Sequence, residues 1–214
     1  MIKLTNILKR RQLKESRMLE QSDLTGKTII NVDIQLEYQS YFTFKTGEWA
    51  RYLTKNWKGN KVVFLYNGES MGMTSEGGYQ EWLSNYIDYE LLEEATFYDK
   101  GYAFFRFCMD EGIDDKATVD LIRFMVKHSI TDSREINTEM WNQFMKETNN
   151  TRQAVRDLLE TAEDMIYVPE LMEELKKYSN PVLMGGGIDE CLREVELGFM
   201  ALDKPYQIVK RFTY

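Results

Sequence analysis

Histidine is almost absent from this sequence of 214 residues, in which His128 is the only one. Zinc sites built from several histidines are therefore excluded, and a cysteine–histidine catalytic pair would have to use this single residue. The two cysteines, Cys108 and Cys191, are too few for a disulfide framework, so we expect a reducing, cytoplasmic setting. With only three prolines and no glycine- and serine-rich linker, the chain gives no sign of two domains on a flexible tether.

Long apolar runs are also missing, and none approaches the roughly 20 residues needed to span a bilayer. The N-terminus has no continuous apolar core, so it does not resemble a signal peptide. The net charge of −8 argues against nucleic acid as a partner, because binding phosphates needs a basic surface. Residues 1–22, however, hold six basic and two acidic residues, which leaves −12 on the remainder. We expect residues 1–24 to form a basic arm or helix that is solvated or contacts another subunit or an acidic partner.

Segments of strand and helix pattern alternate through the rest of the chain, residues 25–214. This order predicts one α/β domain: a Rossmann-like, three-layer, doubly wound and mostly parallel sheet. Apolar and β-branched runs predict strands, and apolar residues spaced by three or four predict helices. The expected strands are 27–35, 61–66, 95–98, 182–184 and 205–214, and the expected helices are 46–57, 75–86, 170–178 and 191–202.

Between about residues 108 and 164 the pattern becomes helical and polar. Three apolar stripes predict an inserted helical subdomain or lid, with Val119, Phe144 and Leu158 as representative members. Asp114 and the segment 131–133 are candidate helix caps. The aromatic and methionine stripes of this insertion are typical of packing surfaces rather than of a cofactor site.

A glycine-rich turn followed by a cysteine stands near the end of the chain. The run 182–184 leads into Gly185, Gly186 and Gly187, which allow a tight strand-to-helix turn. Cys191 then falls in the first turn of a helix, where free backbone N–H groups and the helix dipole favour a thiolate. Cys191 is therefore a candidate nucleophile, although a buried cysteine can equally be a small apolar filler.

Two charged residues follow other predicted strands. Asp33 ends the first strand, at the edge where open α/β sheets bind ligands, and a buried acid there must be paired or used. Lys100 follows the third strand, at the same edge. Taken alone, each has an ordinary alternative: Asp33 could serve packing, and Lys100 could be a solvated loop residue.

The order of these residues and their flanks resembles the isochorismatase-like (nicotinamidase-related) cysteine hydrolases. Asn31-Val-Asp-Ile-Gln35 looks like the first strand of that family. Asp99-Lys-Gly-Tyr-Ala-Phe104 is similar to its lysine motif. Gly185-Gly-Gly-Ile-Asp-Glu-Cys-Leu192 resembles its nucleophile turn. The likeness covers about 120 residues in patches, chiefly 27–68, 95–106 and 166–214.

The resemblance implies a role for each residue. Asp33 is expected to be the general base, Lys100 to stabilise the thiolate and orient the carboxylate, and Cys191 to form a thioester with a small amide or related C–N substrate. It also implies a cis peptide in the turn, at Gly186–Gly187, and an oxyanion hole near Gly186, Gly187 and Glu190. No cofactor or metal is expected, and homo-oligomers are usual in the family.

The sequence departs from the family at two places. Ile188 stands where the family usually has threonine, and the helical insertion lengthens the segment between Lys100 and Cys191. Two other functions therefore stay open. One is a non-catalytic structural or interaction protein that keeps the fold. The other is a PIN-like nuclease that holds Mg²⁺ or Mn²⁺ through acidic residues at the strand ends, namely Asp33, Asp99, Asp189 and Glu194.

Overall fold

The structure, a computed structural model, describes residues 24–101, 112, 114–131, 133–151, 153–154, 157–158 and 171–214. The expected basic arm at residues 1–24 lies outside the described residues except for Leu24, which is buried. Cys108 and a smaller part of the expected insertion also lie outside them. None of the helices in the described part of the chain has an apolar stretch long enough to cross a lipid bilayer.

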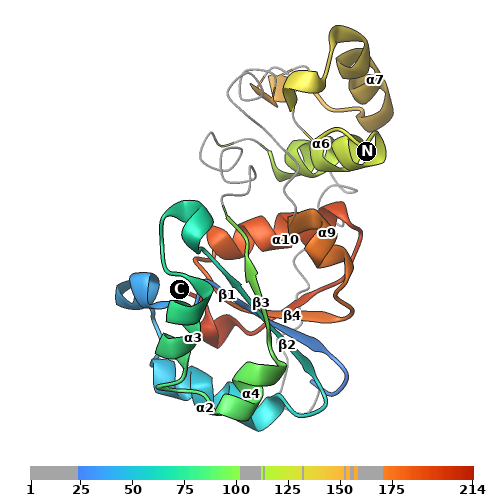
Figure 1. The fold of residues 1–214 in the computed structure, drawn as a ribbon. Coiled ribbons are helices and arrows are strands. Elements are labelled where there is room, and N and C mark those ends of the chain that lie inside the picture. The colour runs from blue at the N-terminus through green and yellow to red at the C-terminus, as the bar shows by residue number, and fades with distance from the viewer. Residues whose placement is uncertain are drawn as a thin grey trace.

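Five parallel strands form one sheet in the order β3-β2-β1-β4-β5, so the fold is α/β (Figure 1). The central strand β1 pairs with β2 on one side and with β4 on the other, as its continuous apolarity predicts. All five residues of β1 and of β4 are buried. The bounds are β1 Thr28–Val32, β2 Lys61–Tyr66, β3 Thr96–Asp99, β4 Pro181–Gly185 and β5 Gln207–Ile208.

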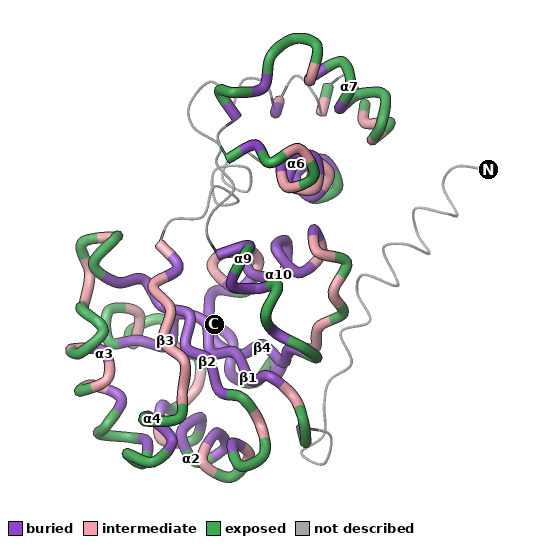
Figure 2. The backbone as a smooth tube through the Cα atoms, turned by 45° about the vertical axis from the view of Figure 1, so that its right-hand side comes forward, coloured by how far each residue is buried: buried purple, intermediate pink, exposed green. Residues whose placement is uncertain are grey.

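Helices cover both faces of the sheet because side chains of the strands alternate between two apolar clusters. Ile29 and Phe64 pack toward α2 (Thr46–Asn56), α3 (Glu76–Leu83) and α4 (Tyr89–Glu94). Ile30 and Leu65 pack toward α9 (Leu171–Lys176) and α10 (Cys191–Ala201). Figure 2 shows the buried positions concentrated in the strands and on the helix sides that face them. Burying each large apolar side chain contributes about 1.5–3 kcal/mol to folding.

The described part of the insertion contains two helices, α6 (Asp115–Lys127) and α7 (Thr138–Thr148), on the side of α10 away from the sheet (Figure 1). Asp114 caps α6 by accepting a hydrogen bond from Lys116 N, as expected. The cap of α7 is Asn137, which accepts from Met140 N, and not the segment 131–133. Asn137 satisfies a free N–H at the helix start in the same way.

Two further expectations about elements were incomplete. The run 205–214 was expected to be one strand, but β5 covers only Gln207–Ile208 and a short 3-10 helix follows at Lys210–Phe212. The 3-10 helix Leu36–Tyr41 and the helix α4 were not expected. The end of the chain instead returns to the sheet through Tyr214, whose N–H donates to Gly186 O at 3.1 Å.

Candidate active site

The ends of four strands bring polar or turn-forming residues to one edge of the sheet. Val32 pairs with Leu65 and with Gly185, and Tyr66 pairs with Asp99, so the strands end nearly level. The first residues after β1, β2, β3 and β4 are therefore neighbours along the carboxyl edge: Asp33, Asn67, Lys100 and Gly186. Parallel α/β sheets place ligand sites at this edge.

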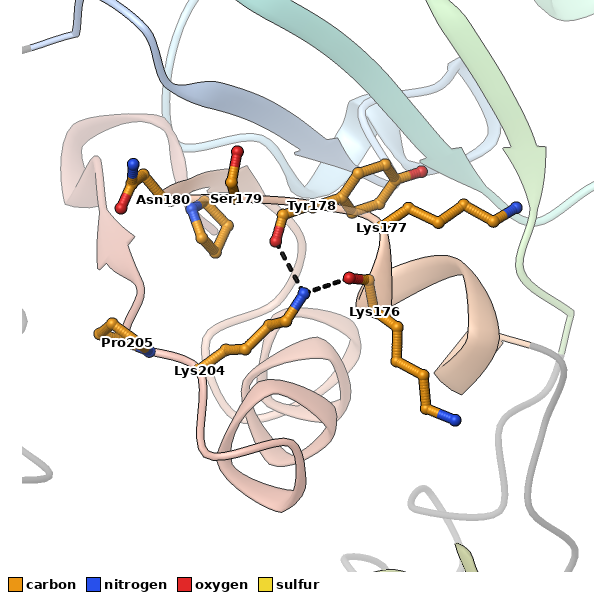
Figure 3. A pocket seen from close by; sticks show the side chains of 8 residues that line it. Lys176, Lys177, Tyr178, Ser179, Asn180, Lys204 and Pro205 are labelled. Carbon is orange, nitrogen blue, oxygen red and sulfur yellow. Dashed lines mark hydrogen bonds between the residues drawn. The ribbon is translucent and has the colours of Figure 1, made fainter.

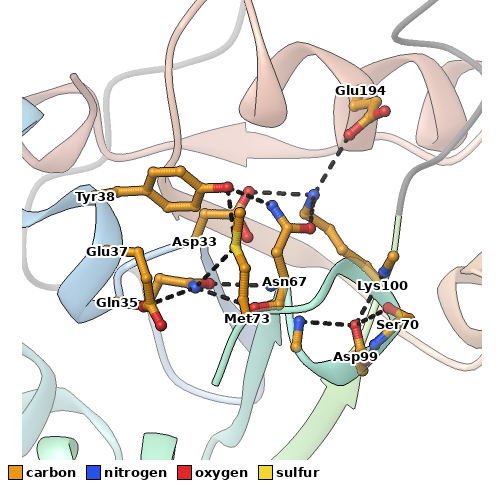
Figure 4. A network of polar contacts seen from close by, with 12 residues as sticks. Asp33, Gln35, Glu37, Tyr38, Asn67, Ser70, Met73, Asp99, Lys100 and Glu194 are labelled. Atoms are coloured by element: carbon orange, nitrogen blue, oxygen red, sulfur yellow. Dashed lines mark hydrogen bonds and ion pairs between the residues drawn. The ribbon is translucent and has the colours of Figure 1, made fainter. Parts of the chain in front are cut away.

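Lys100 is the centre of the polar network at this edge (Figure 4). Its Nζ lies 3.1 Å from Asp33 Oδ2, donates to Asn67 Oδ1 at 2.9 Å and lies 3.5 Å from Glu194 Oε2. The side chains of Lys100, Asp33 and Glu194 are 2%, 0% and 4% exposed. A lysine ammonium has three donors, and three oxygens from three different elements surround this one.

This surrounding keeps Lys100 charged. Burial alone would lower its pKa, but the nearby Asp33, Glu194 and Cys191 raise the pKa above the ordinary value for lysine. Three protein oxygens already lie around the ammonium and face its three donors. The alternative interpretation of Lys100 as a solvated loop residue is therefore wrong.

Asp33 is held rigidly although its carboxylate is only partly used. Its backbone has a φ of 46°, in the left-handed region, and its N–H donates to Leu65 O at 2.8 Å. Its carbonyl oxygen accepts from Tyr214 Oη at 3.0 Å. Neither carboxylate oxygen has a hydrogen-bond partner among the described residues, so the contact with Lys100 is an ion pair. A buried carboxylate with spare acceptor capacity is suited to take a proton.

The thiol of Cys191 belongs to the same site. Cys191 is the first residue of α10 and is partly exposed. Burial raises the pKa of this thiol, the charge of Asp33 raises it further, and Lys100 offsets only part of this effect. Asp33, Lys100 and Cys191 therefore interact with one another, but the expectation that the setting lowers the thiol pKa was wrong. Desolvation and the carboxylate outweigh the ammonium.

The glycine turn brings Cys191 to the edge. Gly185 and Gly186 have φ values of 83° and 65°, a region that other residues seldom adopt. A Cβ on Gly185 would lie 2.2 Å from Val32 O, and one on Gly186 would lie 2.8 Å from Leu192 N. The turn is therefore restricted to glycine at both positions. The expected cis peptide at Gly186–Gly187 is absent, since the described residues contain no cis peptide bond.

Two N–H groups of the turn have no acceptor among the described residues. Glu190 N and Leu192 N both donate to Gly187 O, at 3.0 and 3.1 Å. Glu190 therefore does not supply a free N–H, and its side chain is exposed. Within the described part of the chain, the N–H groups of Gly187 and Cys191 donate to no acceptor. Free N–H groups beside a nucleophile are the usual components of an oxyanion hole.

Three more residues belong to the site of Asp33, Lys100 and Cys191, although the sequence interpretation did not assign them to it. Asn67 directly follows β2; its Oδ1 accepts from Lys100, and its Nδ2 donates to Tyr38 Oη at 2.9 Å. Burial raises the pKa of Tyr38, the hydrogen bond from Asn67 opposes this, and Asp33 and Cys191 add to the rise. Glu194 had been considered only as a metal ligand. Asn67 could have been predicted from its position, because it is a polar residue directly after β2, as Asp33 is after β1 and Lys100 after β3.

The acidic residues considered for a metal site are placed differently. Asp33 and Glu194 both lie against Lys100, whereas Asp99 accepts hydrogen bonds from Gly68 N, Ser70 N, Ser70 Oγ and Gly101 N. Asp189 is exposed. Among the residues that the structure describes, no three acidic, histidine or cysteine side chains are grouped so that they could hold a metal ion.

A hollow of about 200 Å³ lies away from this edge, where α9 leads into the start of β4 (Figure 3). Lys204 lines this hollow, and its Nζ donates to the carbonyl oxygen of Lys176 and, at 2.9 Å, to that of Tyr178. A lysine that caps the last carbonyls of a helix stabilises the helix end. We therefore assign this hollow to the packing of α9 and not to the candidate active site.

No family model matches the sequence, and comparison with curated proteins and with solved structures gave no match.

Proposed function

We propose that this protein is a metal-independent cysteine hydrolase of the isochorismatase-like kind, which cleaves an amide or related C–N bond of a small molecule. The observation that carries the proposal is the joint interaction of Asp33, Lys100 and Cys191 at one edge of the sheet. The strand order and the helices on both faces support the finer description of the fold as Rossmann-like and doubly wound.

In the proposed first step, Cys191 Sγ attacks the carbonyl carbon of the substrate while Asp33 takes the thiol proton. The electron pair of the C=O bond moves to the oxygen, which the free N–H groups of Gly187 and Cys191 stabilise. The C=O bond re-forms as the C–N bond breaks, and the protonated Asp33 gives its proton to the leaving nitrogen. This leaves a thioester on Cys191 and a carboxylate on Asp33.

In the second step, Asp33 takes a proton from a water molecule that attacks the thioester. The C–S bond breaks, the carboxylic acid product leaves, and the proton returns to Cys191. Because the raised pKa keeps the proton on sulfur at rest, the scheme requires Asp33 to accept that proton during attack. Lys100 stays charged throughout and stabilises the developing thiolate.

The proposal includes the setting in which the enzyme works. We infer a cytoplasmic protein that forms homo-oligomers and acts on a small molecule rather than on nucleic acid. The resemblance to the hydrolase family supports the oligomer, and the net charge of −8 supports the exclusion of nucleic acid. The basic segment 1–24 is proposed to contact another subunit or an acidic partner.

The test uses p-nitrophenyl acetate as an activated acyl donor, followed by a panel of small primary amides and ureas. We expect release of p-nitrophenolate, a transient acetyl group on Cys191 by mass spectrometry, and loss of both in Cys191→Ala. Cys108→Ser is the matched control and should keep the activity. An acetyl group found elsewhere, or equal turnover by Cys191→Ala, would refute the hydrolase.

One observation favours a second function, a non-catalytic protein that keeps the fold. The thiol of Cys191 is held protonated by burial and by Asp33, which lowers its reactivity at rest. If this second function is correct, Cys191 will not be acylated by any donor in the panel. The substitution Cys191→Ala will then change only stability.

A further inference from the structure

Glu194 is a second buried carboxylate beside Lys100, and the proposed reaction leaves it without a role. It lies one helical turn after Cys191 on α10, and its side chain is 4% exposed. Its Oε2 is 3.5 Å from Lys100 Nζ. Burying a carboxylate in this way is costly unless its charge is used.

The positions of the two carboxylates differ in a way that matters for proton transfer. Asp33 approaches the Lys100 ammonium from the end of β1, whereas Glu194 approaches it from α10 (Figure 4). Asp33 affects the pKa of the Cys191 thiol more strongly than Glu194 does, and the proposed reaction assigns the thiol proton to Asp33. Once protonated, Asp33 can no longer balance the charge of Lys100.

We propose that Glu194 is a positioning residue of this site, which keeps the Lys100 ammonium charged and in place while Asp33 holds the proton from Cys191. The inference rests on the proposed function for the proton transfer that it serves. Asn67 contributes a neutral oxygen at 2.9 Å from Lys100 Nζ but cannot supply the missing charge. Glu194 thus lets the thiolate form beside a cation at the moment of attack.

As a consequence, the charge of Glu194 should have opposite effects on the Cys191 thiolate in the two protonation states of Asp33. With Asp33 charged, Glu194 is one more negative group near the thiol, and removing its charge favours the thiolate. With Asp33 neutral, Glu194 is the carboxylate that retains Lys100, and removing its charge disfavours the thiolate. Asp33→Asn imitates the neutral aspartic acid and makes the second state accessible to measurement.

The experiment follows alkylation of Cys191 by iodoacetamide between pH 7 and 10, in full-length protein carrying Cys108→Ser. Glu194→Gln is introduced alone and together with Asp33→Asn. The matched control is Glu196→Gln on the same helix, since Glu196 accepts from Tyr206 Oη at 2.8 Å and pairs with Arg193 rather than with Lys100. Circular dichroism confirms that each variant is folded.

At pH 8 we expect Glu194→Gln to speed alkylation about threefold or more when Asp33 is present, and to slow it by a similar factor in the Asp33→Asn protein. Half a pKa unit changes a small thiolate fraction by about this factor. The control should change neither rate. An unchanged or faster rate in the Asp33→Asn protein would overturn the proposal. If that double variant does not fold, Glu194→Asp in the same background should slow alkylation to a smaller extent, and no slowing would again overturn it.

The alkylation assay needs no turnover, so its outcome is separate from that of the proposed function. Suppose that Glu194→Gln changes the alkylation rate in opposite directions with and without Asp33, but that no donor acylates Cys191. That result would refute the hydrolase and keep Glu194 as the residue that retains Lys100. Turnover through Cys191 without the reversal would keep the hydrolase and refute the role of Glu194.

Discussion

The Lys100 ammonium lies 3.1 Å from a carboxylate oxygen of Asp33, and both side chains are buried at the carboxyl edge of a parallel sheet. The register of β1, β2 and β3 creates this pair, because Asp33 and Lys100 each directly follow the last paired residue of a strand. A charged pair in such a place is costly to desolvate, so its presence points to a use beyond stability.

Asp33→Asn is expected to make Cys191 more reactive while it removes catalysis. The charge of Asp33 raises the pKa of the thiol, so its removal lowers that pKa and increases the thiolate fraction. We expect alkylation by iodoacetamide at pH 8 to be about threefold faster or more. At the same time, turnover of p-nitrophenyl acetate should fall because the proton acceptor is lost. Slower alkylation in a folded Asp33→Asn protein would contradict the effect assigned to the Asp33 charge on the thiol.

Asp99→Ala is expected to destabilise the loop after β2. Asp99 accepts four hydrogen bonds from Gly68, Ser70 and Gly101, and these lower its pKa despite the opposing effect of burial. We expect a loss of about 1–3 kcal/mol at pH 7 in urea denaturation. Because the folded pKa is lowered, this contribution is present above the ordinary value near 3.8 and is lost as the pH falls through the folded value. The difference between wild type and variant should therefore shrink below about pH 4.

Gly186→Ala should disrupt the turn that carries Cys191. The new Cβ would lie 2.8 Å from Leu192 N at a φ of 65°. We expect a loss of about 2–4 kcal/mol in unfolding free energy, from the left-handed backbone and the clash together. Gly59→Ala is the control, because Gly59 has a φ of 81° but no neighbouring atom within 4 Å of its Cβ position. Its cost should be only about 1 kcal/mol, and equal costs would show that the turn at Gly186 is not tightly packed.

Arg123→Ala should loosen α6 from α10. Arg123 donates to Met200 O at 2.7 Å and to Ala201 O at 3.2 Å, at the end of α10, and pairs with Asp203. Losing these charge-assisted bonds should cost about 1–2 kcal/mol and increase amide hydrogen exchange in α6. Lys127→Ala is the control, since Lys127 pairs with Glu147 inside the insertion at an exposed position. Its effect should stay below about 1 kcal/mol.

Much of this organisation followed from the sequence, because local patterns report local structure. The spacing of Trp49 and Leu53 predicted α2, the apolar run at 61–66 predicted β2, and Ser75 marked the start of α3. The strand expected over the last ten residues is shortened to Gln207–Ile208, because an apolar, β-branched segment does not show how few partners it has in a sheet. Within 108–164, the structure describes residues 112, 114–131, 133–151, 153–154 and 157–158.

The sequence by itself determined which residues could do chemistry: Asp33, Lys100 and Cys191, each at the end of a strand or the start of a helix. Only the tertiary structure decided what surrounds them. It placed Asn67 and Glu194 against the ammonium, and it showed that burial and Asp33 raise the pKa of Cys191. The reason is physical: a helix end and a neighbouring cation can be predicted along the chain, whereas desolvation and the approach of a second carboxylate depend on segments that meet only after folding.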